Sequence, residues 1–507
     1  MGFILLLVLS FCASAVLANN DKVVVCYYGT WATYRWGVGK FDVEDIDPFL
    51  CTHLVYSFIG IDAQGTAVSL DPHLDLGDVS WTRDNFRKFT SLKDKNPNLK
   101  TLLAVGGWNE ASAKYSVMAA NPNYRQNFIQ SSLAMIQEHN FDGLDVDWEY
   151  PNRRDTVHGS ADIDNFSTLL KELREEFDKH DLMVTVAVSA VEERALLSYD
   201  VPAVAKYVDY VGVMAYDMYG PWDPVTGHNA PLHRSEGDST ENEAALYTVE
   251  NAIKFWLKAG CPPEKLVMGV PFYGRTFTLS DTNANTPRSS AIGAGLAGPY
   301  TATSGFIGYN EFCYLLKTES WTVRTDQLAK VPYAFRASNW VSYDDVESIT
   351  TKVEYANSFN LRGIMLWSIE TDDFHGLCGE GTFPLLKAIN KALSIDYVTS
   401  TPTPGTTVSS SSSTSTSEAS SSESSSSSSS STTTTTTTTP IPGGGSESSL
   451  CKEIGYIPDP ADCSSYYVCI EQVDNSLLPI KFQCPGRLYW DQTYLNCNYD
   501  YLVECNA

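Results

Sequence analysis

Eight short apolar runs, with stretches between them long enough for a helix, leave few architectures open to this 507-residue chain. Most runs are hydrophobic almost without interruption, as strands covered on both faces are. Helix-period stretches such as 165–180 and 242–259 lie between them. Eight strands alternating with helices predict an α/β fold, a (β/α)8 barrel. The runs are Val23–Tyr28, His53–Phe58, Leu99–Val105, Gly143–Trp148, Leu182–Val188, Tyr207–Ala215, Leu266–Phe272 and Gly363–Ser368.

The spacing of the last two runs indicates an insertion. About 90 residues separate them, against roughly 30 for one strand–helix unit. We therefore expect a small α+β subdomain at about 275–350, inserted between strands seven and eight of a barrel domain that spans residues 19–398.

The composition changes on both sides of this body. Residues 1–18 are apolar and end in small residues, with Val16 and Ala18 suited to a signal-peptidase site. Residues 399–449 are almost entirely Ser, Thr, Pro and Gly, so they predict a linker that cannot form a core. Residues 450–507 form a domain too small to be stable without its six cysteines. We expect a secreted, extracellular protein with no membrane span.

Charge and cysteine usage narrow the function classes. The net charge of −26, from 35 basic and 61 acidic residues, argues against a nucleic-acid partner. In an oxidising compartment the dense cysteines of the tail predict disulfides. Zinc is the alternative, but the tail has no histidine and no C-x-x-C pair. The body has an odd number of cysteines, so one of them is expected to be free.

The segment that follows Phe141 carries the chemistry. Residues two apart share a face of a strand, so Asp145, Asp147 and Glu149 point into the barrel and Leu144, Val146 and Trp148 point towards the helices. Three buried acids repel one another, so at least one should have a raised pKa. Glu149 comes last, at the carboxyl end where barrel active sites lie, and a protonated carboxyl there suits general-acid catalysis. A magnesium site is the alternative for these residues.

These residues carry a family resemblance. The segment Asp142–Glu149 resembles the D-x-x-D-x-D-x-E signature of glycoside hydrolase family 18, the chitinases and their lectin-like relatives. The motifs Gly106-Gly107-Trp108, Met214-Ala215-Tyr216-Asp217, Gly269–Arg275 and Met365-Leu366-Trp367 resemble the family's other strand ends, over residues 22–392. One departure is Ala104, where the family often has Ser.

The resemblance implies retaining hydrolysis of β-1,4 bonds between N-acetylglucosamine units, in which the acetamido group of the substrate is the nucleophile. Glu149 would protonate the leaving oxygen and Asp147 would orient the acetamido group. Asp145 would share a proton with Asp147, and Asp142 would support the row. Tyr216 would hydrogen-bond the acetamido oxygen. The resemblance implies no metal and no cofactor.

The resemblance also implies a substrate cleft and disulfides, and the sequence itself contains a glycosylation sequon. Each aromatic taken singly could instead be a core or lid residue, and for Trp31 and Trp222 the two interpretations are almost evenly balanced. The disulfides implied are Cys26–Cys51 and Cys313–Cys378, which leaves Cys261 unpaired, and Asn165 begins a glycosylation sequon. The residues expected to bind substrate are Trp367, Trp108, Asp217, Met214, Tyr27, Phe58, Arg275, Tyr273, Trp31, Trp222, Gly106 and Gly107.

The tail resembles the peritrophin-type chitin-binding domain of invertebrates. Its six cysteines and its aromatic residues carry this resemblance, which implies the pairs Cys451–Cys469, Cys463–Cys505 and Cys484–Cys497. Tyr489, Trp490 and Tyr494 could stack on sugars, although some aromatics in so small a domain must form its core.

We therefore expect a secreted, monomeric chitinase of arthropod type that acts within chitin chains and binds chitooligosaccharides. One rival is a lectin that has lost catalysis, although such relatives usually lack the acid found here at Glu149. A second rival is a structural matrix protein in which the barrel is a spacer. Release of reducing ends from chitin oligomers distinguishes an enzyme from the lectin. Truncation after residue 398 distinguishes an enzyme from the matrix protein, because a truncated enzyme should still cleave soluble oligomers.

Overall fold

The computed structural model describes residues 22–77, 82–241, 247–395, 455–471, 477–484, 488–491, 496–499 and 503. The chain divides into two compact units, Met1–Pro404 and Gly405–Ala507. The expected signal segment 1–18 and linker 399–449 lie outside the described residues, so their boundaries remain predictions.

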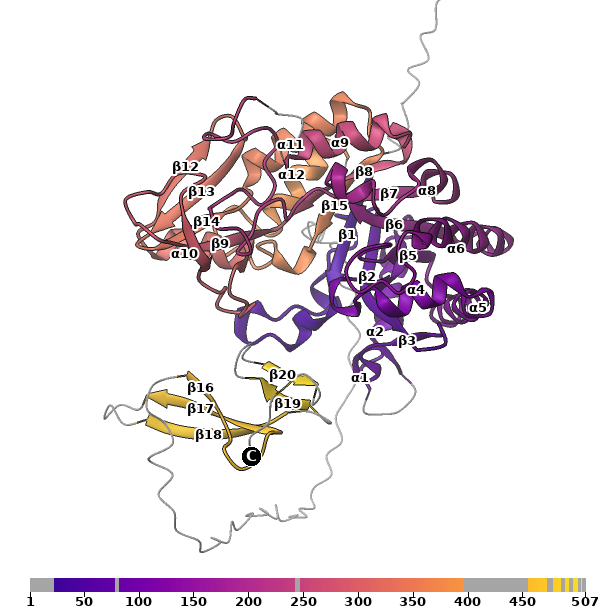
Figure 1. Ribbon diagram of the computed structural model, residues 1–507, viewed down its shortest axis with the longest axis horizontal. Coiled ribbons are helices and arrows are strands. Elements are labelled where there is room, and N and C mark those ends of the chain that lie inside the picture. The colour runs from indigo at the N-terminus through magenta and orange to yellow at the C-terminus, as the bar shows by residue number, and fades with distance from the viewer. Residues whose placement is uncertain are drawn as a thin grey trace, which may run out of the picture. The chain divides into compact units, whose positions relative to one another are not determined.

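The first unit is built around a closed barrel of eight parallel strands (Figure 1). Neighbours pair in chain order, and the last strand, β15, pairs with β1 to close the ring. Each strand coincides with one of the eight apolar runs, so the predicted (β/α)8 barrel is confirmed. The strands are β1 (Val23–Gly29), β2 (His53–Ile61), β4 (Lys100–Gly106), β5 (Gly143–Asp147), β6 (Met183–Ser189), β7 (Tyr210–Met214), β8 (Leu266–Pro271) and β15 (Gly363–Trp367).

Helices surround the barrel (Figure 1). The helix-period stretch at 165–180 corresponds to the second part of α6 and the 3-10 turn that follows it. The stretch at 242–259 contains α9, and the side chain of Thr248 caps the start of that helix. No helix within the described ranges is both long enough and apolar enough to cross a membrane. The helices are α1 (Pro72–Asp75), α2 (Asn85–Thr90), α3 (Leu92–Lys95), α4 (Ala113–Ala120), α5 (Pro122–His139), α6 (Ala161–Phe177), α7 (Glu192–Ala195), α8 (Val201–Tyr207), α9 (Val249–Lys258), α11 (Val346–Ser358) and α12 (Pro384–Ala392).

Alternation along the strands creates two cores. In β1, Val23, Val25 and Tyr27 belong to the small core inside the barrel. Their neighbours Val24, Cys26 and Tyr28 belong to the larger core between strands and helices. The barrel interior is therefore filled, and a functional site can open only at its ends.

The insertion between β8 and α11 is an antiparallel sheet with one helix, as predicted in outline. Its strands pair in the order β10-β9-β14-β13-β12, with β11 on β9. Both body disulfides expected from the resemblance, Cys26–Cys51 and Cys313–Cys378, are present, and Cys261 is a buried free thiol. The elements are β9 (Tyr273–Leu279), β10 (Ala291–Ala294), β11 (Phe306–Gly308), α10 (Tyr309–Thr318), β12 (Thr322–Asp326), β13 (Val331–Arg336) and β14 (Asn339–Ser342).

The second unit is a small β domain. It contains an antiparallel sheet of β16 (Gly455–Pro458), β17 (Ser465–Glu471) and β18 (Leu477–Gln483), and a hairpin of β19 (Leu488–Asp491) and β20 (Asn496–Tyr499). Cys463 and Cys484 are disulfide-bonded. Each pairing expected in the tail includes a cysteine whose side chain lies outside the described set, so those pairings remain predictions.

The expected sugar-stacking residues of the tail are only partly described. Trp490 is buried and stacks on Tyr466 with 4.0 Å between ring centroids. Its assignment as a sugar platform is therefore corrected to a core role, because so small a domain needs a large ring to fill its interior. Tyr489 is half-buried and stays a candidate, and Tyr494 lies outside the described residues.

Candidate active site

An acidic row lies at the carboxyl end of β5 inside the barrel. Asp145, Asp147 and Glu149 are all buried, whereas the alternate residues Leu144 and Val146 pack in the outer core. Asp145 accepts hydrogen bonds from Tyr27 Oη (2.8 Å) and Thr185 Oγ1 (2.5 Å). Both of its oxygens therefore have donors, which weakens the magnesium alternative.

The middle acid differs from its neighbours. Asp147 Oδ1 is buried and has no hydrogen-bond partner among the described residues. A buried carboxylate oxygen without a donor costs free energy, so such an atom marks a place where a ligand group can bind. Hydrogen bonds therefore hold the side chain of Asp145, whereas Asp147 has an oxygen available to a ligand.

Burial dominates the electrostatics of the row. It raises the pKa of Asp145 to about 6, although the hydrogen bonds from Thr185 and Tyr27 oppose the rise. Burial, then the charges of Glu149 and Asp145, raise the pKa of Asp147 well above its usual value. Burial raises the pKa of Glu149 to about 7, with Asp217 adding to the rise and Arg154 opposing it. The row therefore retains protons near neutral pH, and Glu149 can both give and take one.

A second polar group follows β7. Asp217 accepts hydrogen bonds from Tyr273 Oη (2.8 Å) and Arg275 Nε (2.7 Å). Tyr216 is half-buried, and burial raises the pKa of its phenol well above the usual value, so the hydroxyl remains a donor. Burial also raises the pKa of Tyr273. This group offers hydroxyl and guanidinium donors beside the acidic row.

Aromatic rings form a continuous surface at the same end of the barrel. Trp367, at the end of β15, lies 5.7 Å from both Tyr27 and Phe58 and 6.0 Å from Trp31 between ring centroids. Met214 is half-buried and packs on the interior core with these rings. Flat apolar faces of this kind bind the apolar faces of sugars.

Three of the tryptophans expected to bind substrate are open to solvent. Trp31 is 44% exposed, Trp108 59% and Trp222 56%. This exposure contradicts core packing for Trp31 and Trp222. Their assignment to the substrate cleft rather than to a lid stays a prediction. Trp108 lies under the guanidinium of Arg154 at 3.8 Å, and Trp222 lies 5.1 Å from that of Arg275. Trp108 and Trp222 are therefore held in place by cations. Trp31 instead stacks on Phe58, with 6.5 Å between ring centroids.

Two glycines allow the end of β4 to lie close to the acidic row and to Phe58. Gly106 and Gly107 have φ values of 116° and 82°. A Cβ at Gly106 would lie 2.2 Å from the carbonyl oxygen of Asp147, and one at Gly107 would lie 2.6 Å from the Phe58 ring. Both contacts are with the protein itself, so these glycines position the row and Phe58.

Asp142 does not join the row. It lies before β5, at the amino end, where its carboxylate accepts hydrogen bonds from Thr101 N (2.8 Å) and Lys93 Nζ (2.9 Å). These charge-assisted bonds lower the pKa of Asp142 against the effect of burial. The assignment of Asp142 to the catalytic row is corrected to an anchor of β4 and β5. Asp142 precedes Asp145 by three positions, an odd number, so the pleat turns it to the opposite face.

Two residues of the site were missed at the sequence level. Asn229, buried in the loop after β7, accepts a hydrogen bond from Asp217 N (3.0 Å) and donates to Tyr273 O (3.1 Å). Arg154 donates to the carbonyl oxygens of Glu149 (3.1 Å) and Trp108 (2.9 Å). Neither residue lies on a strand, and only the folded loops bring them to the site. The sequon residue Asn165 is half-buried on α6, and its occupancy stays a prediction.

Comparison with known proteins gives a consistent result. Residues 23–372 match the family model described as Glycosyl hydrolases family 18, and residues 451–505 match the Chitin binding Peritrophin-A domain. The chain is 42% identical to Probable chitinase 2 of Drosophila melanogaster, over 77% of this chain and 87% of that protein. It is 38% identical to an Endochitinase of Manduca sexta, over 77% and 72%. A crystal structure of Ostrinia furnacalis Group IV chitinase in complex with allosamidin is 75% identical, with a TM-score of 0.73, over 74% of this chain and 99% of that one.

Proposed function

This chain belongs to glycosyl hydrolases family 18, and from that membership and the site described above we propose how it acts on chitin. It is a chitinase that hydrolyses β-1,4 linkages between N-acetylglucosamine units with retention of configuration. Its tail is a chitin-binding domain of the peritrophin type. Chitin and chitooligosaccharides are therefore its binding partners.

The first half of the reaction breaks the glycosidic bond. Glu149 donates its proton to the leaving oxygen as the bond from that oxygen to the anomeric carbon breaks. The acetamido oxygen of the same sugar attacks that carbon, which gives an oxazolinium ion and the shortened chain as leaving group. Asp147 passes the proton that it shares to Asp145, and its carboxylate then accepts a hydrogen bond from the acetamido N–H and stabilises the cation. Tyr216 donates to the acetamido oxygen and fixes its direction of attack.

The second half restores the enzyme. Glu149, now a carboxylate, takes a proton from water while the water oxygen bonds to the anomeric carbon and opens the oxazolinium ring. The acetamido group is regenerated and the configuration is retained. A sugar without an acetamido group has no internal nucleophile, so cellulose oligomers should not be hydrolysed.

The observation that carries this assignment is the unpaired Oδ1 of Asp147. It lies between an acid held by two donors and an acid with a pKa of about 7. A substrate N–H would supply the missing donor, and its arrival places the acetamido group beside the anomeric carbon that Glu149 serves.

The test measures release of reducing ends from chitin tetramer by wild type, Glu149→Gln and Asp147→Asn. We expect each substitution to lower kcat by about 10²-fold to 10⁴-fold, since each removes a group that acts in the transition state. Gln and Asn keep the size of the side chains, so binding of the tetramer should persist. Equal rates for wild type and Glu149→Gln would instead favour a lectin whose background activity comes from elsewhere.

Secretion, action within chains and a monomeric state complete the proposal. The apolar segment 1–18 and the disulfides support an extracellular location. Trp31 contacts Trp367 and is open to solvent, which suits a cleft that a polymer can cross. Size-exclusion chromatography with light scattering tests the monomer, and product lengths over time test cleavage within chains.

A further inference from the structure

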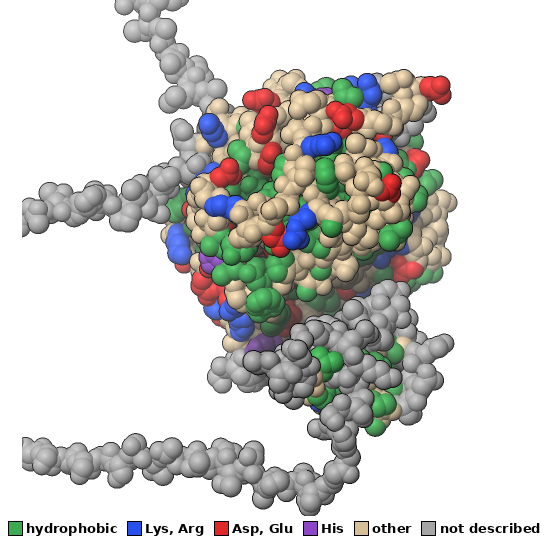
Figure 2. Space-filling model, turned by 90° about the vertical axis from the view of Figure 1, so that its left-hand side faces the viewer, with side chains coloured by type: hydrophobic (Ala, Val, Ile, Leu, Met, Phe, Trp, Pro, Cys, Tyr) green, Lys and Arg blue, Asp and Glu red, His purple; other side chains and the backbone are tan. Residues whose placement is uncertain are grey.

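A pocket of about 270 Å³ lies apart from the acidic row. Three segments form it: the loop after β1, the part of the insertion around α10, and the chain that follows β15. Figure 2 looks at the side of the molecule that carries the insertion, where hydrophobic side chains gather among charged ones. The pocket's walls are mostly aromatic or aliphatic, namely Val38, Tyr300, Tyr314, Phe374, His375 and Leu377.

The rim of the pocket is open and its hydrogen-bonding groups are unused. Tyr314 is 45% exposed and Leu377 43%. Within the described part of the chain, the hydroxyls of Tyr300 and Tyr314 and the ring nitrogens of His375 have no hydrogen-bond partner. The pocket thus combines apolar faces with free donors and acceptors.

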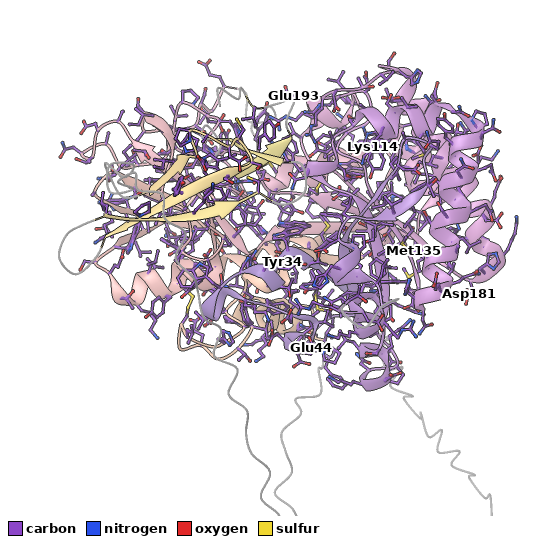
Figure 3. All side chains as sticks on the ribbon, turned by 90° about the horizontal axis from the view of Figure 1, so that it is seen from below. Tyr34, Glu44, Lys114, Met135, Asp181 and Glu193 are labelled. Carbon is purple, nitrogen blue, oxygen red and sulfur yellow. A yellow bond between two sulfur atoms is a disulfide. The ribbon has the colours of Figure 1, made fainter. Side chains whose placement is uncertain are left out.

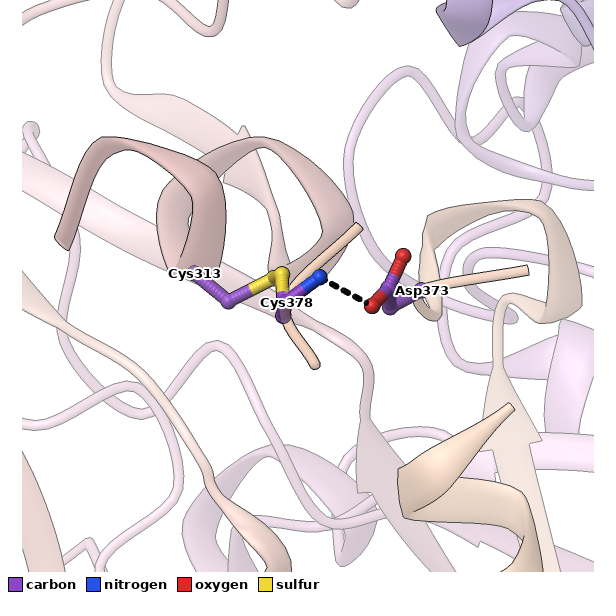
Figure 4. Close-up of side chains that lie close together, drawn as sticks. All are labelled: Cys313, Asp373 and Cys378. Carbon is purple, nitrogen blue, oxygen red and sulfur yellow. Dashed lines mark hydrogen bonds between the residues drawn. A yellow bond between two sulfur atoms is a disulfide. The ribbon is translucent and has the colours of Figure 1, made fainter. Parts of the chain in front are cut away.

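The floor of the pocket is rigid. Asp373 accepts hydrogen bonds from the backbone of Leu377 (2.9 Å) and Cys378 (2.7 Å), and Cys378 is joined to Cys313 of α10 (Figure 4). The carboxylate of Asp373 is therefore satisfied, and the two sulfurs are bonded to each other rather than free to bind a metal. The pocket has the fixed shape that lowers the entropic cost of binding.

One loop connects this pocket to the aromatic surface of the active site. Trp31 and Trp36 both lie on the loop after β1: Trp31 contacts Trp367, and Trp36 contacts Tyr300 at 4.9 Å between ring centroids. Arg35 holds the loop through a hydrogen bond to the backbone oxygen of Glu370 (3.4 Å). Tyr34, labelled in Figure 3, projects from the same loop and donates to Asp71 at 2.6 Å. Exposed aromatics therefore extend from the active site to the pocket.

We propose that this pocket is a second sugar-binding site, outside the catalytic cleft, that holds an N-acetylglucosamine unit of chitin. The proposal rests on the proposed function and adds a site to it. The volume lies just below the roughly 300 Å³ at which small-molecule pockets begin, so it suits one sugar unit rather than a chain. The aromatic faces suit a sugar ring, the free hydroxyls suit its polar groups, and no unpaired charge demands an ionic ligand.

The test compares full-length wild type with Tyr314→Ala and Tyr314→Phe. Val323→Ala is the matched control, because Val323 is similarly exposed on the same insertion and lies away from the pocket. We expect Tyr314→Ala to reduce the rate on insoluble chitin at low loading by about threefold to tenfold, the loss expected when one ring contact is removed. Val323→Ala should behave as wild type. Tyr314→Phe should lie between wild type and Tyr314→Ala, because it keeps the ring and lacks the hydroxyl. All four proteins should cleave chitin trimer equally.

Competition and a second variant complete the design. Free N-acetylglucosamine should reduce the difference between wild type and Tyr314→Ala on insoluble chitin, whereas cellobiose should not. Leu377→Asn, at the opposite rim, should reproduce the loss if Tyr314→Ala folds poorly. The proposal is overturned if Tyr314→Ala and Leu377→Asn match wild type on insoluble chitin, if Val323→Ala loses as much, or if trimer cleavage falls in parallel. Failure of wild type to cleave any chitin substrate would instead overturn the proposed function.

Discussion

At the scale of single residues, burial keeps the acidic row protonated at pH values where solvent-exposed carboxyl groups are ionised. Asp145, Asp147 and Glu149 lie where hydration is poor, and the charges of Glu149 and Asp145 raise the pKa of Asp147 further. Arg154 and the donors to Asp145 limit this effect. The balance leaves Glu149 close to half-protonated at neutral pH, the condition under which one side chain serves as acid and then as base.

The pH dependence of activity follows from Glu149. Its proton must be present when the leaving oxygen departs, and its pKa is about 7. We expect kcat/KM on chitin tetramer to fall as pH rises through about 7, by nearly tenfold per pH unit beyond it. A rate that stays flat up to pH 9 would show that Glu149 is not the proton donor.

Stability should depend on the same proton. Burial raises the pKa of Glu149 from 4.5 to about 7, so the folded state binds more protons than the unfolded state between these values, and the free energy of unfolding falls as pH rises through this window. Glu149→Gln removes the penalty, so we expect it to exceed wild type by up to about 3 kcal/mol at pH 8. Below pH 4.5 the difference should vanish. Denaturant titrations at the two pH values provide the measurement.

Arg154 tunes the same group from outside the row. Its charge lowers the pKa of Glu149, and its guanidinium also lies over Trp108. We expect Arg154→Ala to move the alkaline limb of the activity profile to higher pH, since the protonated acid then persists. Arg154→Lys keeps the charge and is the control. A shift to lower pH in the alanine variant would contradict this assignment.

At the scale of elements, the close contact of β4 with the end of β5 depends on one glycine. A Cβ at Gly106 would meet the Asp147 carbonyl at 2.2 Å, and the positive φ is unfavourable for other residues. We expect Gly106→Ala to lower the free energy of unfolding by roughly 2–4 kcal/mol and to reduce kcat, because the backbone under Asp147 must shift. Ala104→Gly, in the same strand but inside the barrel core, separates loss of activity from loss of packing. A wild-type kcat in Gly106→Ala would refute the positioning role.

The sequence predicted strands better than loops, for physical reasons. A strand has a period of two, so the alternation after Gly143 indicated which side chains enter the barrel, and the structure agrees. Asn229 and Arg154 reach the site from loops, where no period relates sequence to direction. Asp142 was assigned from the family signature, although its odd spacing from Asp145 already excludes a shared face.

At the scale of the whole molecule, we expect the tail to bind chitin and the barrel to cleave it. The tail matches a chitin-binding domain, and the acidic row lies wholly within the barrel. We expect truncation after residue 398 to weaken retention on insoluble chitin by about tenfold or more, since a tethered binder raises the local substrate concentration. Cleavage of soluble trimer should remain within about twofold of wild type. Equal loss on both substrates would mean that the tail supports the barrel itself.

The sequence was sufficient to predict how the chain divides into domains, but it did not predict the pocket near Tyr314. Runs, low-complexity composition and clustered cysteines are local properties that can be read in order. The pocket joins Val38, Tyr300 and Leu377, which are far apart in sequence and share no motif. Such a surface exists only after three connections have packed against one another.

Closure of the barrel by β1 and β15 has a consequence for synthesis. The first and last strands of the ring are separated by more than three hundred residues, and Trp367 completes the aromatic surface from the last of them. While the ribosome is still translating the insertion, the nascent barrel has two bare edges and no active centre. Chains released early should therefore be both inactive and prone to associate through those edges, and the enzyme becomes competent only when its final strand emerges.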